Sequence, residues 1–285
     1  MIETVVSARR RSVGTLAVAR VLPSVGRRSV GPFTFLDHIG PVDLDASVDA
    51  DVRPHPHIGL ATVTYLFDGE FVHRDSLGSV QAIRPGAINW MNAGRGIAHS
   101  ERLPPERKAG RLHGIQLWVA LPTAHEESEP VFRHHPADAL PTLDIEGVAV
   151  RLLVGSAYRA RSPVATVSPM YYAEVDMGAG DALPMPDDQP ERAAYVVEGS
   201  VTCGDRTIRA RELVVFRAGA DPWLTADSAA RVMLLGGQPV DGARHIWWNF
   251  VSSSRERIEQ AKRDWAAGRF AAIPGDDDPV PLPEA

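Results

Sequence analysis

Short runs of β-branched and aromatic residues recur along most of the chain, and glycine, proline or aspartate bounds each run. Runs of this kind with turn residues between them are typical of the strands of a β-sandwich or barrel. The pattern therefore predicts an all-β fold. The clearest predicted strands cover residues 61–67, 114–121, 148–155, 170–177, 193–201, 212–219 and 230–237.

A helical pattern appears late in the sequence. Over residues 252–268 the apolar residues share one helical face, Ser253 and Glu256 fit a capping box, and Gly268 ends the pattern. We expect a helix there. The residues that follow, 274–285, are acidic and rich in proline, which predicts a loose tail.

An internal repeat supports a division of the chain into two parts and is consistent with a duplicated β-barrel. Residues 64–71 (TYLFDGEF) and 194–201 (AYVVEGSV) share a tyrosine, two apolar residues, an acidic residue and a glycine in the same order. Each copy reads as strand, tight turn and strand. A polar stretch that contains proline, at residues 133–144, falls between the copies and predicts a domain boundary.

Two short motifs carry the candidate chemistry. RPHPHIG places His55 and His57 one residue apart, and GRGIAHSER does the same for His99 and Glu101. Because alternate residues of a strand face the same side, three imidazoles and one carboxylate can meet between two strands. Burying such groups without a partner is costly, whereas a divalent first-row transition metal satisfies all four. The alternative is a chance pairing of histidines.

The second copy of the repeat lacks these histidines. When Tyr65 is aligned with Tyr195, Met185 and Asp187 fall on the positions of the two histidines in RPHPHIG. The sequence therefore predicts one metal per chain, held in the first copy.

Other histidines have less specific surroundings. His73 either faces the metal site or is exposed on a strand. We expect His38 in a turn, and His134 and His135 in loops.

Composition narrows the partners and the compartment. A net charge of -6 over 285 residues gives no general attraction to nucleic acid or anionic lipid. A single cysteine, Cys203, excludes an internal disulfide framework, and no stretch reads as a signal peptide or a membrane span. We expect a cytoplasmic monomer without a direct nucleic-acid or membrane partner.

Longer stretches of the chain resemble the signature blocks of the pirin family, and together they run from about residue 20 to the late helix. The blocks are residues 22–41, 53–70, 84–101, 112–122 and 247–254. Pirins are bicupins with one metal in the N-terminal cupin. The resemblance implies two jelly-roll cupin barrels with a C-terminal helix. The implied regions are a metal-binding cupin at 1–135, a cupin without metal ligands at 136–245, and a helix with an acidic tail at 246–285.

The resemblance also implies a site and an activity. The family's metal ligands fall on His55, His57, His99 and Glu101. Fe(II) is the expected ion, and Mn, Ni, Cu or Zn would also suit these ligands. Some pirins resemble quercetin 2,3-dioxygenases, which implies a flavonol-like planar aromatic substrate, O2, and Glu101 as catalytic base. The alternatives are an iron-dependent, redox-sensing module that regulates a transcription factor or a metabolic enzyme, and a cupin that binds metal for stability.

Two positions depart from the family pattern. Ala61 stands where many pirins have glutamate, and Ile58 stands where they often have arginine. We expect a less polar rim at Ile58 and the loss of a polar contact at Ala61.

Overall fold

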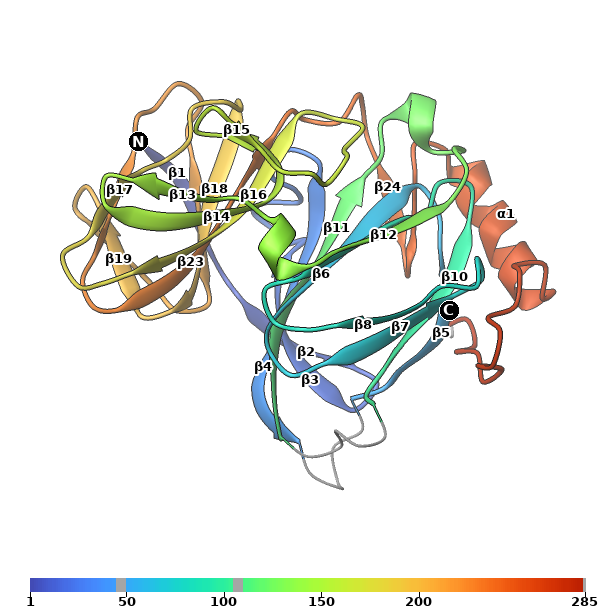
Figure 1. Ribbon diagram of the computed structural model, residues 1–285. Coiled ribbons are helices and arrows are strands. Elements are labelled where there is room, and N and C mark those ends of the chain that lie inside the picture. The colour runs from blue at the N-terminus through green and yellow to red at the C-terminus, as the bar shows by residue number, and fades with distance from the viewer. Residues whose placement is uncertain (45–49, 105–109, 284–285) are drawn as a thin grey trace. The chain divides into compact units, whose positions relative to one another are not determined.

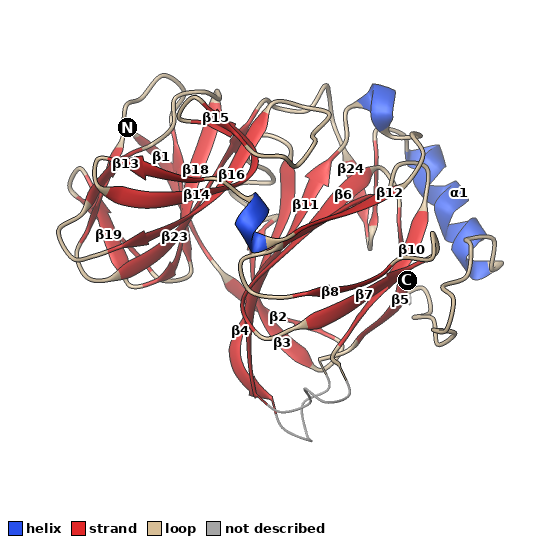
Figure 2. Ribbon diagram, in the orientation of Figure 1, coloured by secondary structure: helices blue, strands red, loops and turns tan. Residues whose placement is uncertain are grey.

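The computed structural model describes residues 1–44, 50–104 and 110–283. Its chain forms two compact units, which we call the first and the second barrel unit. The first comprises Arg11–Val18, Ile39–His134 and Val240–Ala285, and the second Met1–Arg10, Ala19–His38 and His135–Pro239. Strands make up most of both units (Figure 2). The predicted all-β fold is confirmed.

The first barrel unit is built on a larger and a smaller sheet (Figure 1). Neighbours in the larger sheet are, in order, β12 (Val131–His135), β9 (Ile88–Asn92), β6 (Leu60–Asp68), β11 (Gly110–Ala120), β4 (Phe33–Leu44), β3 (Leu16–Leu22) and β2 (Arg9–Val13). Each of the last three strands also includes residues of the second barrel unit. The smaller sheet pairs β5 (Val52–His57), β10 (Ile97–Arg102), β7 (Phe71–Asp75) and β8 (Val80–Ile83). Leu66 and Leu112 of the larger sheet pack in one core cluster with Phe71 and Ile83 of the smaller sheet.

The second barrel unit repeats this plan. Its larger sheet runs β1 (Ile2–Ser7), β21 (Glu212–Phe216), β18 (Glu191–Glu198), β23 (Ala230–Gly237), β16 (Met170–Met177), β14 (Val148–Ala157) and β13 (Thr142–Ile145), with β15 (Ala160–Arg161) on β14. Its smaller sheet runs β17 (Ala182–Pro184), β22 (Trp223–Ala226), β19 (Ser200–Cys203) and β20 (Arg206–Arg209). Both predicted copies of the repeat are confirmed as strand, glycine turn and strand, at Gly69 and Gly199.

A hairpin and a helix follow the second barrel in sequence and join the first barrel unit. The hairpin pairs β24 (His245–Trp247) with β25 (Phe250–Ser252), and helix α1 spans Arg255–Ala266. Buried Ile258 and Ala261 of α1 pack against Phe250. The helix is confirmed, and among the described residues no helix is both long and apolar enough to cross a membrane.

The predicted capping box is wrong by one residue. Ser254 is the N-cap, and its hydroxyl accepts the Arg257 N–H at 3.2 Å. Ser253 is not free to cap the helix, because its N–H and hydroxyl both donate to Glu126.

The prediction of a loose tail is also wrong for the described residues. Asp276 forms an ion pair with Arg102 of β10, and the Val280 N–H donates to the Pro54 carbonyl of β5 at 2.8 Å. The indole N–H of Trp265 in turn donates to the Val280 carbonyl. The tail therefore lies against the smaller sheet of the first barrel unit (Figure 1). Residues 284–285 of the predicted tail lie outside the described residues.

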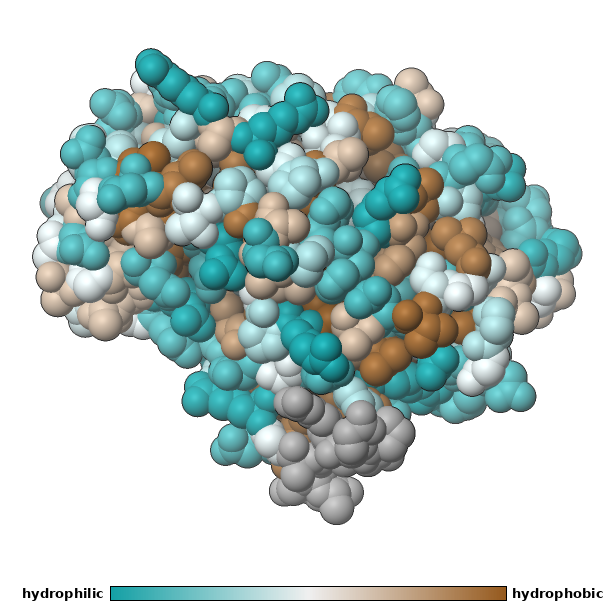
Figure 3. Space-filling view, viewed as in Figure 1, coloured by the Kyte–Doolittle hydropathy of each residue, from teal (hydrophilic) through white to brown (hydrophobic). Residues whose placement is uncertain are grey.

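Hydrophilic side chains cover most of the face in Figure 3, but apolar side chains gather over β7 and β8. Leu77, in the turn between these two strands, and Val80, the first residue of β8, are about half exposed.

Candidate metal centre

Three histidines meet on two neighbouring strands of the smaller sheet. In the antiparallel pair of β5 and β10, His99 lies opposite His55, and Ile97 lies opposite His57. One ligand nitrogen from each of the three histidines lies within 4.8 Å of the other two. The structure thus brings together three of the four predicted ligands, in a group that could hold a metal ion.

Hydrogen bonds fix which ring nitrogen each histidine can offer. The Nδ1 atoms of His55 and His57 lie 2.8 Å from the Arg53 carbonyl and 3.1 Å from the Asn249 carbonyl, to which each donates its proton. In the neutral ring of each residue, Nε2 therefore has a lone pair that can bind a metal ion. His99 turns Nδ1 toward His73, and its buried Nε2 has no hydrogen-bond partner among the residues that the structure describes. A buried nitrogen without a partner is what a metal site requires.

Burial keeps these rings neutral. It lowers the pKa of His55 to about 4, and it lowers the pKa of His57 and His99 well below the ordinary value. The positive charge that each ring would place on its neighbours acts in the same direction. Neutral imidazoles have a lone pair for a cation, so the donors fit a transition metal at neutral pH.

Glu101 is buried and follows His99 by two residues on β10, but it does not belong to the group of three histidines. Its Oε1 accepts the Thr64 hydroxyl at 2.9 Å, and it lies opposite His73 in the pairing of β10 with β7. A bulge between His99 and Glu101 shifts the register with β5. Burial raises the pKa of the Glu101 carboxyl. Whether it is a ligand stays a prediction.

The sequence left open whether His73 faces the metal site or is exposed on a strand. It is buried on β7, its ring stacks on Phe132 at 4.1 Å, and its Nε2 lies 2.9 Å from Asp75 Oδ2. Burial alone would raise the pKa of Asp75, but its hydrogen bonds, led by that from His73, hold the pKa below its usual value. The strand pattern of FVHRD places His73 and Asp75 on one face, but it does not say which face is buried.

Two other predictions for histidines are wrong. His38 lies in β4 rather than in a turn, and its Nδ1 is 2.8 Å from the Tyr195 hydroxyl. His134 and His135 belong to β12 rather than to loops, and His134 Nδ1 lies 2.8 Å from Asn89 Oδ1.

Strand β6 of the larger sheet supplies further residues on the site's side. Thr64 contacts Glu101, and Thr62 pairs with Trp118, whose ring meets the His57 ring edge-on at 5.3 Å. Because side chains alternate along a strand, Ala61 lies on the opposite face. A glutamate at that position would point away from these residues.

The predicted rim residue Ile58 does not line the site. It is buried against Phe250 and Ile258, beneath α1. Gly59, which follows it, has φ +67°, and a Cβ at this position would lie 2.0 Å from the Val251 carbonyl oxygen. The glycine of RPHPHIG therefore lets β25 approach the turn between β5 and β6.

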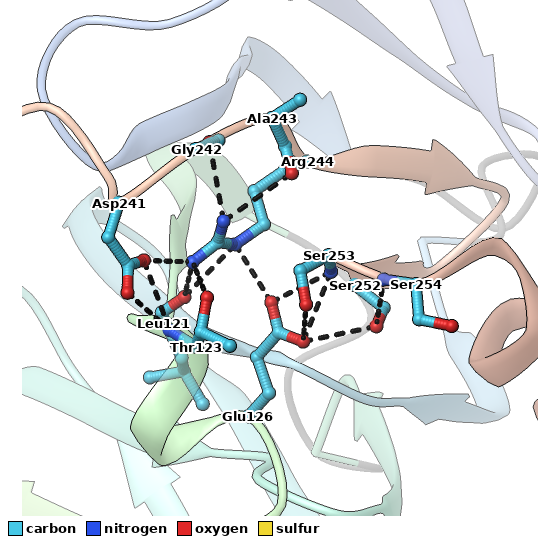
Figure 4. A network of polar contacts seen from close by, with 10 residues as sticks. All are labelled: Leu121, Thr123, Glu126, Asp241, Gly242, Ala243, Arg244, Ser252, Ser253 and Ser254. Carbon is cyan, nitrogen blue, oxygen red and sulfur yellow. Dashed lines mark hydrogen bonds and ion pairs between the residues drawn. The ribbon is translucent and has the colours of Figure 1, made fainter.

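A buried ion-pair network holds the hairpin that supplies the Asn249 carbonyl. Arg244 lies 2.8 Å from Glu126 Oε1, and both side chains are almost fully buried. Glu126 also accepts hydrogen bonds from Ser252 and Ser253, while Arg244 donates to the Leu121 carbonyl (Figure 4). Residues on both sides of β24 and β25 are thus fixed to the segment after β11.

The fold and the histidine cluster define a class of protein. Two barrels, with a buried three-histidine cluster in the first, describe a bicupin that could bind a metal in its N-terminal cupin. The chain belongs to the pirin family. The Pirin model matches residues 15–119, and the Pirin C-terminal cupin domain model matches residues 172–271. The predicted bicupin fold and the family resemblance are therefore confirmed.

Relatives support this assignment along the whole chain. A pirin-like protein of Caulobacter vibrioides is 49% identical, and the match covers 100% of both chains. A Pseudomonas aeruginosa protein provisionally named quercetin 2,3-dioxygenase is 40% identical over 94% of this chain and 85% of its own. The crystal structure of a quercetin 2,3-dioxygenase from Acinetobacter baumannii superposes with a TM-score of 0.91 at 32% identity, covering 99% of this chain and 95% of that one.

Proposed function

We propose that the protein is a metal-dependent dioxygenase of the pirin type that cleaves flavonols such as quercetin with O2. The observation that carries the proposal is the convergence of three buried, neutral histidines in the first barrel unit. The similarity to proteins named quercetin 2,3-dioxygenase, at 40% and 32% identity, supports the reaction class.

His55, His57 and His99 would hold one divalent transition metal, and Glu101 would be the fourth ligand. Fe(II) is the ion we favour, although a set of three nitrogens and one oxygen also accepts Mn, Ni, Cu or Zn. When bound, the metal supplies a Lewis-acid and redox centre for substrate and O2.

Glu101 is the candidate general base. Its carboxyl pKa is raised by burial, which makes its carboxylate form a better proton acceptor. The Thr64 hydroxyl holds Oε1, so the carboxylate has a fixed direction from which to take the proton of a flavonol hydroxyl. Trp118, beside His57, presents an aromatic surface on the same side. Such a surface suits a flat aromatic substrate.

The test is oxygen consumption by iron-loaded protein in the presence of quercetin. We expect turnover in the wild type, and a fall of about 10²- to 10⁴-fold in Glu101→Gln, as is usual for the loss of a general base. Metal content, measured in parallel, should change far less. Glu70→Gln is the matched control, because Glu70 is also buried but pairs with Arg84. This variant should keep full turnover.

Two results would contradict the proposal. Undiminished turnover in Glu101→Gln would exclude Glu101 as the base. No oxygen consumption across a panel of flavonols, by protein with one bound iron, would favour the redox-sensing binding module instead.

A further inference from the structure

A chain of buried polar groups leads away from the metal centre on the side of β7. Asp75, His73 and His99 are each at most 2% exposed. His73 Nε2 lies 2.9 Å from Asp75 Oδ2, and His73 Nδ1 lies 3.4 Å from His99 Nδ1. The three side chains therefore form one line that ends at the buried His99 Nε2, for which the described part of the chain offers no hydrogen-bond partner.

The positions of the protons along this line follow from the hydrogen bonds of Asp75, at the end of the line farthest from the metal centre. Asp75 Oδ1 accepts the N–H groups of Leu77 and Ser79, at 2.9 and 3.0 Å, which fixes the carboxylate. Both oxygens of an ionised carboxylate accept, so a neutral His73 carries its proton on Nε2, where it donates to Oδ2, and has a lone pair on Nδ1. That lone pair faces His99 Nδ1, which must donate. A neutral His99 with its proton on Nδ1 has its own lone pair on Nε2.

We propose that Asp75 and His73 are positioning residues that set the tautomer of His99 and so make its Nε2 available to the metal. Each of the three histidines would then have its Nδ1 proton bound by the protein. For His55 and His57 the acceptors are backbone carbonyls, whereas for His99 the acceptor is a side chain that a substitution can change. The inference rests on the proposed metal site but not on the dioxygenase reaction.

Asp75→Asn tests the proposal because it keeps the shape of the side chain but replaces the accepting oxygen Oδ2 with an amide nitrogen that donates. With Oδ1 still accepting the two backbone N–H groups, the new amide nitrogen donates to His73 Nε2. His73 then carries its proton on Nδ1, and His99 must carry its own on Nε2, facing the metal. Substitutions behind a metal-binding histidine usually weaken metal affinity about 10- to 100-fold.

Two measurements report the effect without any turnover. In metal-free protein labelled with ¹⁵N-histidine, NMR at neutral pH should show His99 protonated on Nδ1 in the wild type and on Nε2 in Asp75→Asn. Zinc affinity, from competition with a chromophoric chelator, should fall about 10- to 100-fold. The control Glu70→Gln removes another buried carboxylate that is bound to Arg84 rather than to a histidine. This control should change neither measurement.

The proposal is overturned if His99 keeps its Nδ1 proton in Asp75→Asn, or if that variant binds zinc as tightly as the wild type. If Asp75→Asn fails to fold, the NMR measurement of the histidine protons in the wild type is sufficient to test the proposal. A His99 proton on Nε2 refutes the proposal, and one on Nδ1, with the His73 proton on Nε2, supports it. Wild type that binds zinc but does not consume oxygen with quercetin would contradict the proposed function and leave this inference intact.

Discussion

At the scale of single residues, the candidate centre depends on uncharged nitrogen. Three imidazoles packed with ring centroids 4.3 to 5.0 Å apart could not all carry protons, because their charges would repel one another in a buried setting. Acid should therefore act on the folded state through these rings as well as through the loss of metal.

We predict that metal-free protein loses stability as the pH falls from about 7 toward 4. His55 titrates near 6.5 when unfolded and at about 4 when folded, so between these values the unfolded chain binds more protons. For His55 alone, the free energy of unfolding should drop by roughly 2 kcal/mol between pH 7.5 and pH 5. Urea unfolding in the presence of EDTA would measure it.

His55→Gln should remove part of this pH dependence. His125→Gln, on the short 3-10 helix Thr123–His125, is the matched control and should leave the dependence unchanged. A slope that is the same in wild type and His55→Gln would show that His55 does not titrate as the structure implies.

The sequence could identify His55, His57 and His99 because an alternating strand pattern is local, and two such patterns suffice to place three rings together. It could not decide on His73. Whether a strand residue is buried depends on the sheet that packs over it, and the covering ring of Phe132 lies 59 positions along the chain. The Asn249 carbonyl, 192 positions from His57, leaves no signal in the motif at all.

At the scale of elements, the hairpin of β24 and β25 connects the ion pair of Glu126 and Arg244 to the candidate metal centre. It is fixed by Glu126 and Arg244 at one end, and the Asn249 carbonyl that it contains accepts the proton of His57 in the candidate metal centre. A contact between residues far apart in the sequence also explains why the predicted helix cap is wrong by one residue. Local sequence fits Ser253 as well as Ser254, and the contact of Ser253 with Glu126, 127 positions away, decides between them.

We predict that Glu126→Gln is strongly destabilising. It leaves the buried guanidinium of Arg244 without its full counter-charge, and breaking one side of a buried ion pair typically costs about 3 to 5 kcal/mol. Urea unfolding would measure the change. Asp241→Asn removes the other carboxylate that contacts Arg244, but that carboxylate is exposed, so its effect should be much smaller.

The double variant Glu126→Leu with Arg244→Met completes the experiment. If the cost of Glu126→Gln comes from an uncompensated charge, the double variant should be less destabilised than the single one. Equal losses in the single and double variants would instead mean that packing, not charge, holds the hairpin.

At the scale of the whole molecule, two barrels of the same plan have different interiors. In the second barrel unit, Met185 is buried in an apolar core cluster together with Leu183, Val196 and Leu234. Asp187, at the position of the second histidine, is exposed. The repeated strand, glycine turn and strand indicated a duplication in the sequence, and the resemblance to pirins identified the two copies as cupin barrels.

We predict one tightly held metal per chain. Elemental analysis after dialysis should give about one equivalent in the wild type and none in His55→Ala with His57→Ala, since the proposed ligands all lie in one barrel. Asp187→Ala, the matching position in the second barrel, should keep one equivalent. Two equivalents in the wild type, or retention of metal by the double variant, would contradict the assignment.

The contact between His57 and Asn249 also has a consequence for biosynthesis. A ribosome that adds about 5 to 20 residues per second needs on the order of 10 to 40 s to make the 192 residues between them. During that interval the nascent first barrel has its histidine pair, but it lacks the hairpin that orients His57 and the tail that lies against β5. The proposed metal site can therefore reach its mature geometry only when the chain is nearly complete, and products of premature termination would lack the carbonyl that orients His57.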